Sequence, residues 1–289
     1  MKQKHRSILA SKSVWFWLIL LSLIASIAAH IWLAGIKRPV PPAIGYSIDS
    51  PSVWSDTNVD RIRVSTYNIH RGKGVDRIFD LSRTAKVLQD SDVIGINEVA
   101  GPTIFGEPNQ AQILAKKLNM GWLYAPNQVR WFRNHFGNGL LSRFPVSFWA
   151  SEPLIYDQNE SHSLKNIITA EIQLSDSYIA VLITHLDLGG IRSAQLTRVI
   201  ERFNRYGCAI LMGDMNSGAK DTRINTLVGQ DGVVDAIAKA LGDQTPKMRV
   251  DWIFTRGFEV IDGGMTEVGI SDHPYFWVDL KLMKPICIK

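Results

Sequence analysis

Apolar and polar residues alternate along the chain in blocks whose spacing predicts the secondary structure. Residues 13–35 form the longest apolar stretch and contain no Asp, Glu, Lys or Arg. Short apolar runs typical of strands follow at 62–70, 92–99, 138–146, 167–174, 178–185, 208–214, 250–256 and 275–282. Helical spacing of apolar residues predicts helices over 76–91, 109–119 and 191–206. Because strands and helices alternate, with hairpins among them, we expect layered α/β architecture with a mixed sheet or two packed sheets.

Turn residues and caps divide these elements. Asn109 is a candidate N-cap for the second helix. Pro145 cuts the strand predicted over 138–146. The tripeptide SDS at 175–177 separates two strands and predicts a hairpin.

The apolar stretch over 13–35 predicts a transmembrane helix. It is long enough to cross a hydrocarbon core of about 30 Å at about 1.5 Å per residue. Trp15, Trp17 and Trp32 lie near its ends, where indole rings favour the membrane interface. A cleaved signal peptide is the alternative, because 26–30 offers small residues for cleavage. The apolar run continues past that point, and this favours an uncleaved anchor.

Basic residues flank this segment unevenly. Four precede it, in the tail 1–12, and Lys37 and Arg38 follow it. The positive-inside rule then places the N-terminus in the cytoplasm and the rest of the chain outside. We predict a basic tail (1–12), a transmembrane helix (13–35), a proline-rich linker (36–60) and one catalytic domain (61–289).

Composition narrows the class of protein only slightly. The 289 residues are 46% hydrophobic and 20% charged, which is ordinary for a globular protein. The net charge of +5 lies partly in the N-terminal tail, so the remainder is too mild to indicate nucleic-acid binding. The two cysteines, Cys208 and Cys287, make neither a disulfide framework nor a zinc cluster, and we expect Cys208 to be a buried thiol.

Polar side chains stand at the ends of several predicted strands. Asn68 closes the first strand and Glu98 the second, whereas Asp251 interrupts a strand that is otherwise apolar. Strand ends gather residues that are distant in sequence, so we expect these side chains to line one crevice. The candidates are Asn68, Glu98, His185, Asp214, Asn216, Asp251, Asp272 and His273.

Taken singly, most of these residues have a structural explanation. Asn68, Asp214 and Asn216 are typical turn formers, and a histidine such as His185 is often structural. Asp251 is harder to explain in this way, because a carboxylate in a buried strand costs several kcal/mol unless it is paired.

Other positions are weaker candidates. Asn138 lies between two glycines and is typical of a turn. Arg71 and Lys73 belong to RGKG, which lacks the spacing of a phosphate-binding Walker loop. Arg192 lies in the first turn of a predicted helix and is a candidate substrate contact or a structural residue.

As a set, the strand-end residues have a coherent chemical use. Carboxylate and amide oxygens suit a hard cation such as Mg²⁺ or Mn²⁺. No cysteine belongs to the set, which argues against zinc–thiolate chemistry. Two histidines beside carboxylates suit proton transfer or phosphate binding. This combination is the one that metal-assisted hydrolysis of a phosphoester requires.

The ordered motifs resemble those of the endonuclease/exonuclease/phosphatase superfamily. They are TYNIH (66–70), INEV (96–99), THLD (184–187), GDMN (213–216), DWIF (251–254) and SDH (271–273). The resemblance covers about 61–282. It implies a four-layer α/β/β/α sandwich of two mixed sheets flanked by helices, with the site at the top of the two sheets.

The resemblance also implies roles for the matching residues. Glu98 corresponds to the principal metal ligand, with Asn68 beside it and Asp272 as a further ligand, for Mg²⁺ or Mn²⁺. Asp214 corresponds to the residue that aligns or deprotonates the attacking water, and Asn216 to an amide that contacts phosphate.

The remaining correspondences concern proton transfer and the substrate rim. His185 corresponds to a histidine that binds phosphate or protonates the leaving group. His273 contacts phosphate or acts as a base, with its ring oriented by Asp251. Asn138 corresponds to a residue at the rim near the substrate.

Two positions depart from the family pattern. Asn97 stands where glutamine usually precedes the metal-binding glutamate, which shortens a supporting contact and leaves the ligand intact. His185 stands where abasic-site endonucleases carry tyrosine. The second departure favours the branch that contains DNases, sphingomyelinases and small bacterial phosphodiesterases.

Three functions are compatible with these features. The first is a membrane-anchored, Mg²⁺-dependent phosphodiesterase acting on a phospholipid or another phosphoester near the bilayer. The second is a tethered or secreted nuclease, since 122–139 interleaves aromatic residues with Arg130 and Arg133; a loop covering the core is the alternative reading of that segment. The third is an inactive binding module, which the complete residue set disfavours.

Overall fold

A computed structural model describes residues 2–35, 37–48, 59, 61–103, 106–130, 136–154, 164–174 and 177–283. Two compact units are present: one contains helix α1 (Lys2–Gly35), and the other is an α/β domain. Within α1, Val14–Leu33 is long and apolar enough to cross a membrane. A signal sequence near an N-terminus can meet the same criteria of length and hydropathy, so this segment fits both interpretations given above.

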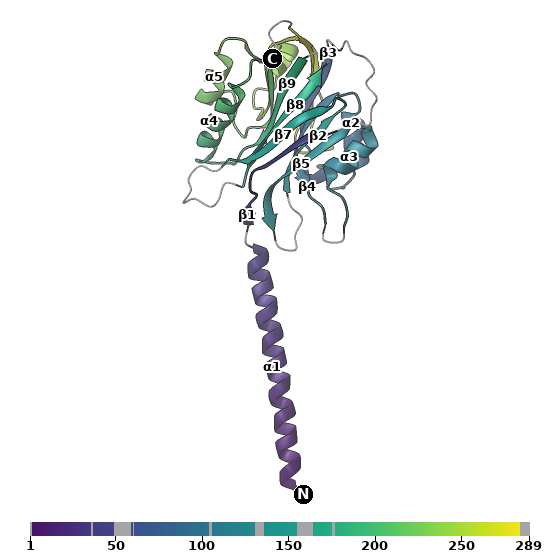
Figure 1. The fold of residues 1–289 in the computed structure, drawn as a ribbon, viewed down its shortest axis with the longest axis vertical. Coiled ribbons are helices and arrows are strands. Elements are labelled where there is room, and N and C mark those ends of the chain that lie inside the picture. The colour runs from purple at the N-terminus through teal and green to yellow at the C-terminus, as the bar shows by residue number, and fades with distance from the viewer. Residues whose placement is uncertain are drawn as a thin grey trace. The chain divides into compact units, whose positions relative to one another are not determined.

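Two mixed sheets of seven strands form the centre of the domain (Figure 1). The first sheet has the order β1 (Lys37–Pro39), β5 (Gly121–Arg130), β6 (Phe136–Ser142), β4 (Val93–Ala100), β3 (Arg61–Asn68), β14 (Phe276–Leu282) and β13 (Phe258–Met265). The second has the order β11 (Val233–Asp235), β12 (Asp251–Arg256), β10 (Ala209–Asp214), β9 (Ser177–His185), β8 (Asn166–Leu174), β7 (Val146–Pro153) and β2 (Ala43–Ile48).

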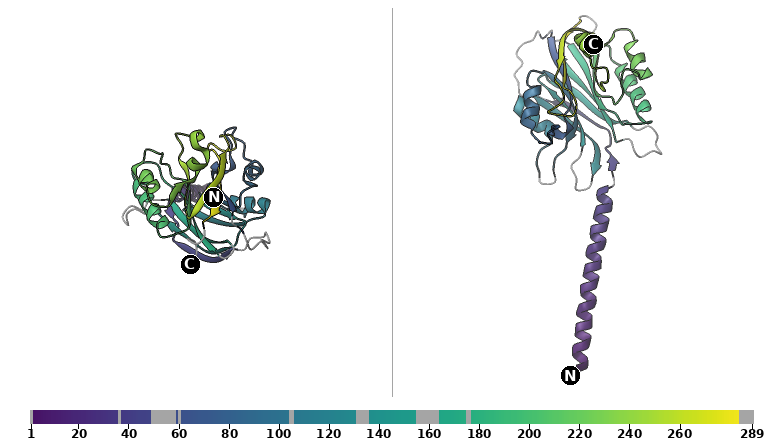
Figure 2. Two further views of the ribbon diagram at one scale, coloured as in Figure 1. Left: turned by 90° about the horizontal axis from the view of Figure 1, so that it is seen from above. Right: turned by 180° about the vertical axis from the view of Figure 1, so that it is seen from behind.

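Helices cover the outer faces of both sheets (Figures 1 and 2). Helices α2 (Leu81–Leu88) and α3 (Gln110–Leu118) pack on the first sheet, and α4 (Arg192–Phe203) and α5 (Thr222–Val228) pack on the second. The shorter helices are α6 (Ala236–Leu241), η1 (His70–Gly72) and η2 (Gly242–Gln244). The predicted four-layer architecture, helix, sheet, sheet, helix, is confirmed.

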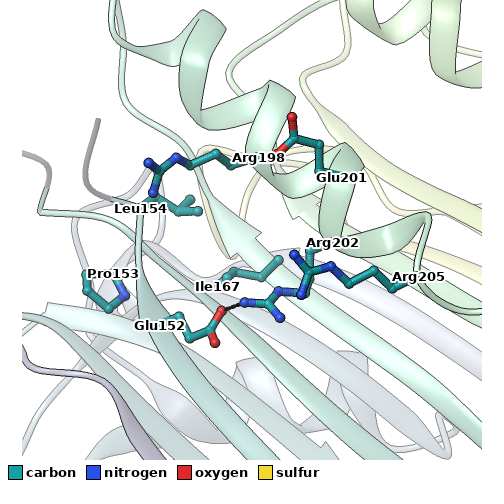
Figure 3. A pocket seen from close by; sticks show the side chains of 8 residues that line it. All are labelled: Glu152, Pro153, Leu154, Ile167, Arg198, Glu201, Arg202 and Arg205. Carbon is teal, nitrogen blue, oxygen red and sulfur yellow. Dashed lines mark hydrogen bonds and ion pairs between the residues drawn. The ribbon is translucent and has the colours of Figure 1, made fainter. Parts of the chain in front are cut away.

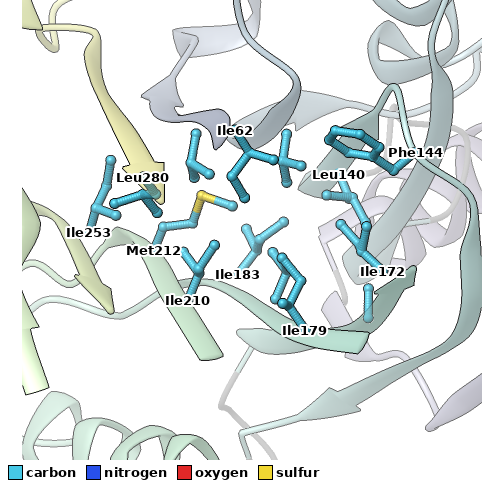
Figure 4. Close-up of a cluster of buried hydrophobic side chains, with 14 of the residues drawn as sticks. Ile62, Leu140, Phe144, Ile172, Ile179, Ile183, Ile210, Met212, Ile253 and Leu280 are labelled. Atoms are coloured by element: carbon cyan, nitrogen blue, oxygen red, sulfur yellow. The ribbon is translucent and has the colours of Figure 1, made fainter. Parts of the chain in front are cut away.

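The largest apolar cluster lies between the two sheets (Figure 4). Ile183 and Met212 from the second sheet meet Ile62 and Leu140 from the first in this layer. Burial of such side chains stabilises the fold by about 1.5–3 kcal/mol each. The packed layer therefore fixes the two sheets, and the strand ends they carry, against each other.

Several predicted elements are shorter or longer than expected. The helix predicted over 76–91 begins at Leu81, because Asp80 caps it by accepting hydrogen bonds from Ser82 N and Arg83 N. Asn109 caps α3 as predicted, accepting from Gln112 N at 2.9 Å. The hairpin expected around 175–177 is confirmed by antiparallel pairing of β8 with β9.

Part of the expected linker is not a linker. Strands β1 and β2 lie within 36–60, and β2 extends the second sheet by pairing antiparallel with β7. The rings of Tyr46 and Phe148 pack in a tilted arrangement, with 5.6 Å between their centroids. Edge strands tolerate prolines and lack a clean alternation of apolar residues, which explains why the sequence pattern concealed them.

Cys208 is disulfide-bonded, so its interpretation as a buried thiol is wrong. The chain contains one other cysteine, Cys287, which lies outside the described residues. Two cysteines far apart in the sequence form no spacing signature of a disulfide framework, and this is why the sequence did not indicate a bond at Cys208.

Candidate active site

Three candidate residues form one row across the second sheet. Asp214 ends β10 and is paired in register with His185 of the parallel strand β9. On its other side Asp214 is paired with Asp251 of the antiparallel strand β12. All three side chains are buried. The strand register therefore brings together residues that lie up to 66 positions apart in the sequence.

The adjacent edge of the first sheet contributes Asn68 and Glu98. Asn68 of β3 is paired with Asn97 of the parallel strand β4. The pairing of β4 with β6 shifts register between Ile96 and Val99, and Glu98 has a φ of 58°. A bulge with a left-handed residue redirects a side chain, and such strain is typical of functional sites. Glu98 is half-buried at this bulge.

Hydrogen bonds join these two edges. Asn68 Nδ2 donates to Asp214 Oδ2 at 3.2 Å, and Asn97 Oδ1 accepts from the Asp214 main-chain N at 2.9 Å. Asn97 Nδ2 also donates to the carbonyl of Thr184 at 3.1 Å. Asn97 thus holds the ends of β9 and β10 against β4.

Asp214 reaches its position because a glycine precedes it. Gly213 has a φ of 132°, and a Cβ there would lie 1.9 Å from the Thr184 carbonyl oxygen. Only glycine permits that approach. Asp214 Oδ1 accepts from Asn216 N at 2.9 Å, and its Oδ2 lies 3.4 Å from His185 Nε2 and 3.8 Å from His273 Nε2.

His273 and Asp251 form the closest titratable pair of the site. His273 Nδ1 lies 2.7 Å from Asp251 Oδ2, so the imidazole is oriented by the carboxylate. Burial lowers the pKa of His273, but the hydrogen bond and the charges of Asp251, Asp214 and Asp272 outweigh burial and raise this pKa to about 9. His273 is therefore a cation at neutral pH.

Burial acts differently on Asp214 and His185. It raises the pKa of Asp214, the charge of Asp251 adds to this effect, and the resulting pKa is about 6. It lowers the pKa of His185 well below the ordinary value, and the charges of Lys165 and His273 lower it further. At neutral pH the site pairs a neutral His185 with a cationic His273.

Arg192 forms a hydrogen bond with the main chain of Asn216. Arg192 Nη1 donates to the Asn216 carbonyl at 2.6 Å, and Asn216 Nδ2 donates to the Leu186 carbonyl at 2.7 Å. Asn216 also has a left-handed φ of 47°. Arg192, considered as a substrate contact, instead holds the main chain that carries Asn216.

Asn138 does not lie at the rim. It is fully buried in β6, where its Oδ1 accepts from Asn97 Nδ2 at 2.8 Å and its Nδ2 donates to Asn166 Oδ1 at 2.8 Å. Its role is to support Asn97 from below. The neighbouring glycines indicate close strand packing, since a Cβ on Gly137 would lie 2.1 Å from the Ala125 carbonyl oxygen.

Asp272 lies in the loop before β14, which is tied to β3. Ser271 Oγ donates to the Asn68 carbonyl at 2.6 Å, and Asp272 Oδ1 lies 3.4 Å from His70 Nδ1. Asp272 is exposed, unlike the buried row on the second sheet. Ser271 was not singled out from the sequence, although its place in SDH was the available signal.

The donor set expected to hold a divalent cation consists of oxygen atoms. The carboxylates of Glu98 and Asp272 and the amide of Asn68 belong to adjacent ends of β3, β4 and the loop before β14. Oxygen ligands of this kind suit Mg²⁺ or Mn²⁺. The strained backbone of Glu98 is independent support for a functional role of its side chain, because such strain is typical of functional sites.

Among the described residues, a different set has potential ligand atoms that lie close together. Asp214, Asp251 and His273 each offer one ligand atom, and these atoms lie within 4.8 Å of one another. The hydrogen bond between His273 and Asp251 already satisfies part of this cluster. A cationic His273 also balances charge there, so this cluster does not require a metal for that purpose.

Lys165 is a basic residue of the site that sequence reasoning missed. It directly precedes β8, and its charge acts on Asp187, Asp214 and Glu98. The register of the β8–β9 hairpin places the start of β8 beside the end of β9, where His185 stands. The predicted hairpin was the available signal, because residues at equal distances from its turn lie opposite each other, which places the start of the first strand beside His185.

A cavity beside the second sheet lies away from these residues. It has a volume of about 250 Å³ and lies between α4 and strands β7 and β8 (Figure 3). Glu152 and Arg202 form an ion pair within it. None of the candidate site residues lines this cavity.

Part of the aromatic segment 122–139, considered above for nucleic-acid binding, packs against the hydrophobic core. Trp122 and Tyr124 lie on β5 and pack against the apolar cluster beneath α2 and α3. Trp131, Phe132 and Arg133 lie outside the described residues. For the first two aromatic residues the alternative reading as core cover is confirmed.

Comparison with protein families identifies one match. Residues 65–273 match the model of the "Endonuclease/Exonuclease/phosphatase family". This range includes every residue of the candidate site described above. No curated protein sequence matches the chain.

Solved structures of similar fold come from several organisms. An endonuclease/exonuclease/phosphatase from Beutenbergia cavernae DSM 12333 is 22% identical, with a TM-score of 0.64 over 77% of this chain and 72% of that one. A mannosyl-6-phosphatase from Bacteroides thetaiotaomicron VPI-5482 is 17% identical, with a TM-score of 0.57 over 76% and 99%. D. rerio TDP2, complexed with a single-strand DNA product, gives the same four values. At these identities the similarity concerns the fold.

Proposed function

The chain belongs to the endonuclease/exonuclease/phosphatase family, and on this premise we propose that it is a membrane-anchored, Mg²⁺-dependent phosphodiesterase. Its substrate is a phospholipid or another phosphoester close to the bilayer. The observation that carries the proposal is the position of Asp214. Its Oδ2 lies within 3.2–3.8 Å of Asn68, His185 and His273, which come from both sheets.

Metal-dependent hydrolysis of phosphoric esters is the reaction for which this donor set is suited. Glu98, Asn68 and Asp272 would hold the cation, with Mn²⁺ as an alternative to Mg²⁺. When bound, the cation withdraws negative charge from the phosphoryl oxygens and so lowers the barrier to attack by water.

The chain's own side chains supply the other functions. Asp214 orients the attacking water through Oδ2 and accepts its proton, and a raised pKa makes this carboxylate a stronger base. His273, a cation at neutral pH, donates through Nε2 to a phosphoryl oxygen, and Asp251 fixes its ring. Asn216 and the neutral His185 contact the phosphate on the opposite side.

The anchor supports a substrate near the membrane. Val14–Leu33 tethers the domain, and tethering raises the effective concentration of a bilayer substrate. The disulfide at Cys208 supports a domain outside the cytoplasm, because disulfides persist in oxidising compartments. The disulfide agrees with the orientation that the flanking basic residues predict, with the N-terminus in the cytoplasm.

The test uses the full chain in detergent micelles or vesicles. Activity is measured with Mg²⁺ or with EDTA on bis-p-nitrophenyl phosphate, mixed-phospholipid vesicles and plasmid DNA. Asp214→Ala is compared with Asp243→Ala, which removes an exposed carboxylate of η2. Metal-dependent turnover of the diester or lipid, lost only in Asp214→Ala, supports the proposal. Cleavage of DNA alone would establish a nuclease instead.

A further inference from the structure

Lys165 brings a positive charge close to the carboxylates of the site. The side chain interacts through space with Glu98, Asp214 and Asp187, which belong to β4, β10 and the loop after β9. Within the described residues these interactions involve no direct hydrogen bond to the ammonium group. Among the residues that the structure describes, the ammonium is therefore attracted to three acids without forming a hydrogen bond to any of them.

The main chain holds Lys165 firmly in place. Its carbonyl accepts from Leu154 N at 2.8 Å, at the end of β7. The next residue, Asn166, is buried and donates to the carbonyls of Ala125 and Pro126 at 3.2 and 3.0 Å. Asn166 also accepts from Asn138. The lysine thus directly precedes Asn166, which belongs to the same network of hydrogen-bonded asparagine side chains that supports Asn97 and Asp214.

The neighbouring acids do not explain this lysine. Asp187 has a partner of its own, because its Oδ2 accepts from Gln195 Nε2 at 2.7 Å and its main-chain N donates to Gln195 Oε1 at 2.9 Å. Asp214 is bonded to Asn68 and Asn216. Burial lowers the pKa of Lys165, which shows that the ammonium is partly withdrawn from water.

A second observation points to a ligand in this region. His185 Nδ1 is buried and has no hydrogen-bond partner within the described part of the chain. His185 lies close enough to Lys165 for the lysine charge to lower its pKa. An anionic substrate could satisfy both the ammonium of Lys165 and this imidazole nitrogen, neither of which has a hydrogen-bond partner among the described residues.

We propose that Lys165 is a substrate-binding residue whose Nζ donates to a non-bridging oxygen of the phosphoryl group. This inference rests on the proposed function and assigns a phosphate contact to a residue outside the recognised motifs. The phosphoryl group then lies between Lys165 and His185 on one side and His273 on the other. A charge-assisted hydrogen bond of this kind changes affinity by about 10- to 100-fold.

The test measures binding of inorganic phosphate and turnover of bis-p-nitrophenyl phosphate by the full chain. Lys165→Met is expected to raise the dissociation constant of phosphate about 10- to 100-fold, and Lys165→Arg to retain most of the affinity. The matched control is Lys116→Met, which removes an exposed lysine of α3. Lys165→Gln serves as a second neutral variant, and circular dichroism reports folding of each.

Asp187→Asn separates binding from a structural role. If Lys165 only neutralises Asp187, then Asp187→Asn and Lys165→Met lower the melting temperature alike and leave phosphate binding unchanged, which overturns the proposal. If Lys165 binds phosphate, then Asp187→Asn leaves phosphate binding intact or strengthens it. Phosphate titration does not depend on turnover. Absent hydrolysis by the wild type refutes the proposed function, and unaltered phosphate binding by Lys165→Met refutes the lysine contact.

Discussion

Asp251→Asn is expected to move both limbs of the pH–rate profile to lower pH. His273 has a pKa of about 9 against an ordinary 6.5, and Asp251 is the first of the groups that raise it, through a hydrogen bond of 2.7 Å and its charge. The whole increase corresponds to about 3 kcal/mol at about 1.4 kcal/mol per pKa unit. Removing the charge of Asp251 should lower the alkaline limb by about 1 to 2 pH units, because Asp214 and Asp272 supply the remainder.

The acid limb should move in the same direction for a different reason. Asp214 must be ionised to accept a proton from water, and its pKa is raised to about 6 by burial and by the charge of Asp251. Without that charge, ionisation of Asp214 becomes easier, so the acid limb falls as well, by less than about 1 pH unit. We therefore expect the bell-shaped profile of Asp251→Asn to shift to lower pH as a whole, and this is distinct from a narrowing in which only one limb moves.

The assay records kcat/KM for bis-p-nitrophenyl phosphate between pH 5 and pH 10 for wild type, Asp251→Asn and Asp243→Asn. NMR titration of the His273 ring in metal-free protein measures its pKa directly. The reasoning is refuted if the alkaline limb stays in place, or if the two limbs move in opposite directions. An unchanged profile for the exposed-site variant Asp243→Asn excludes a general effect of net charge.

Further predictions concern stability and metal. Asp214→Asn should abolish activity and raise the unfolding free energy of metal-free protein at pH 8 by about 1–3 kcal/mol, as measured by urea denaturation. The reason is that the pKa of Asp214 in the folded protein, about 6, lies above the ordinary 3.8. The stabilising contribution of this carboxyl group is therefore lost as the pH rises through 6. For His273, whose folded pKa is raised, the stabilisation is complete below pH 6.5 and is lost through about pH 9, so the melting temperature of wild type should fall over that interval and that of Asp251→Asn should fall less. Asn97→Ala should lower the unfolding free energy by about 2–4 kcal/mol and activity by more than tenfold, because it leaves the Asp214 N–H and the Thr184 carbonyl without partners; equal stability of mutant and wild type would contradict this. EDTA should remove activity and Mg²⁺ should restore it, whereas activity that persists in EDTA would contradict a metal requirement.

Much of the site was predictable because strand pattern and strand ends are local properties. The apolar run over 208–214 ends in Asp214, and the run over 178–185 ends in His185. Parallel pairing of β9 with β10 then places these ends side by side. The sequence contains no direct sign of which strand pairs with which, so it could not show that the strand-end residues lie in one site.

Other features depend on contacts that no local pattern records. The glycines around Asn138 indicated a turn, but they permit close approach of β5, and Asn138 is a buried link to Asn97. Arg192 stands where a substrate contact was plausible, yet its guanidinium meets the Asn216 carbonyl. The disulfide at Cys208 and the edge strand β2 are likewise long-range features of the fold.

The order of strands in the first sheet has a consequence for the moment at which the protein becomes active. Strand β14 lies between β3 and β13, although it comes last among the described strands, and His273 lies three residues before it. A nascent chain that has produced every residue up to β12 already contains His185, Asp214 and Asp251, yet it lacks the His273 imidazole that pairs with Asp251. Synthesis and folding must therefore reach the C-terminal strand before the phosphate site is complete, and a prematurely terminated chain is expected to be inert rather than weakly active.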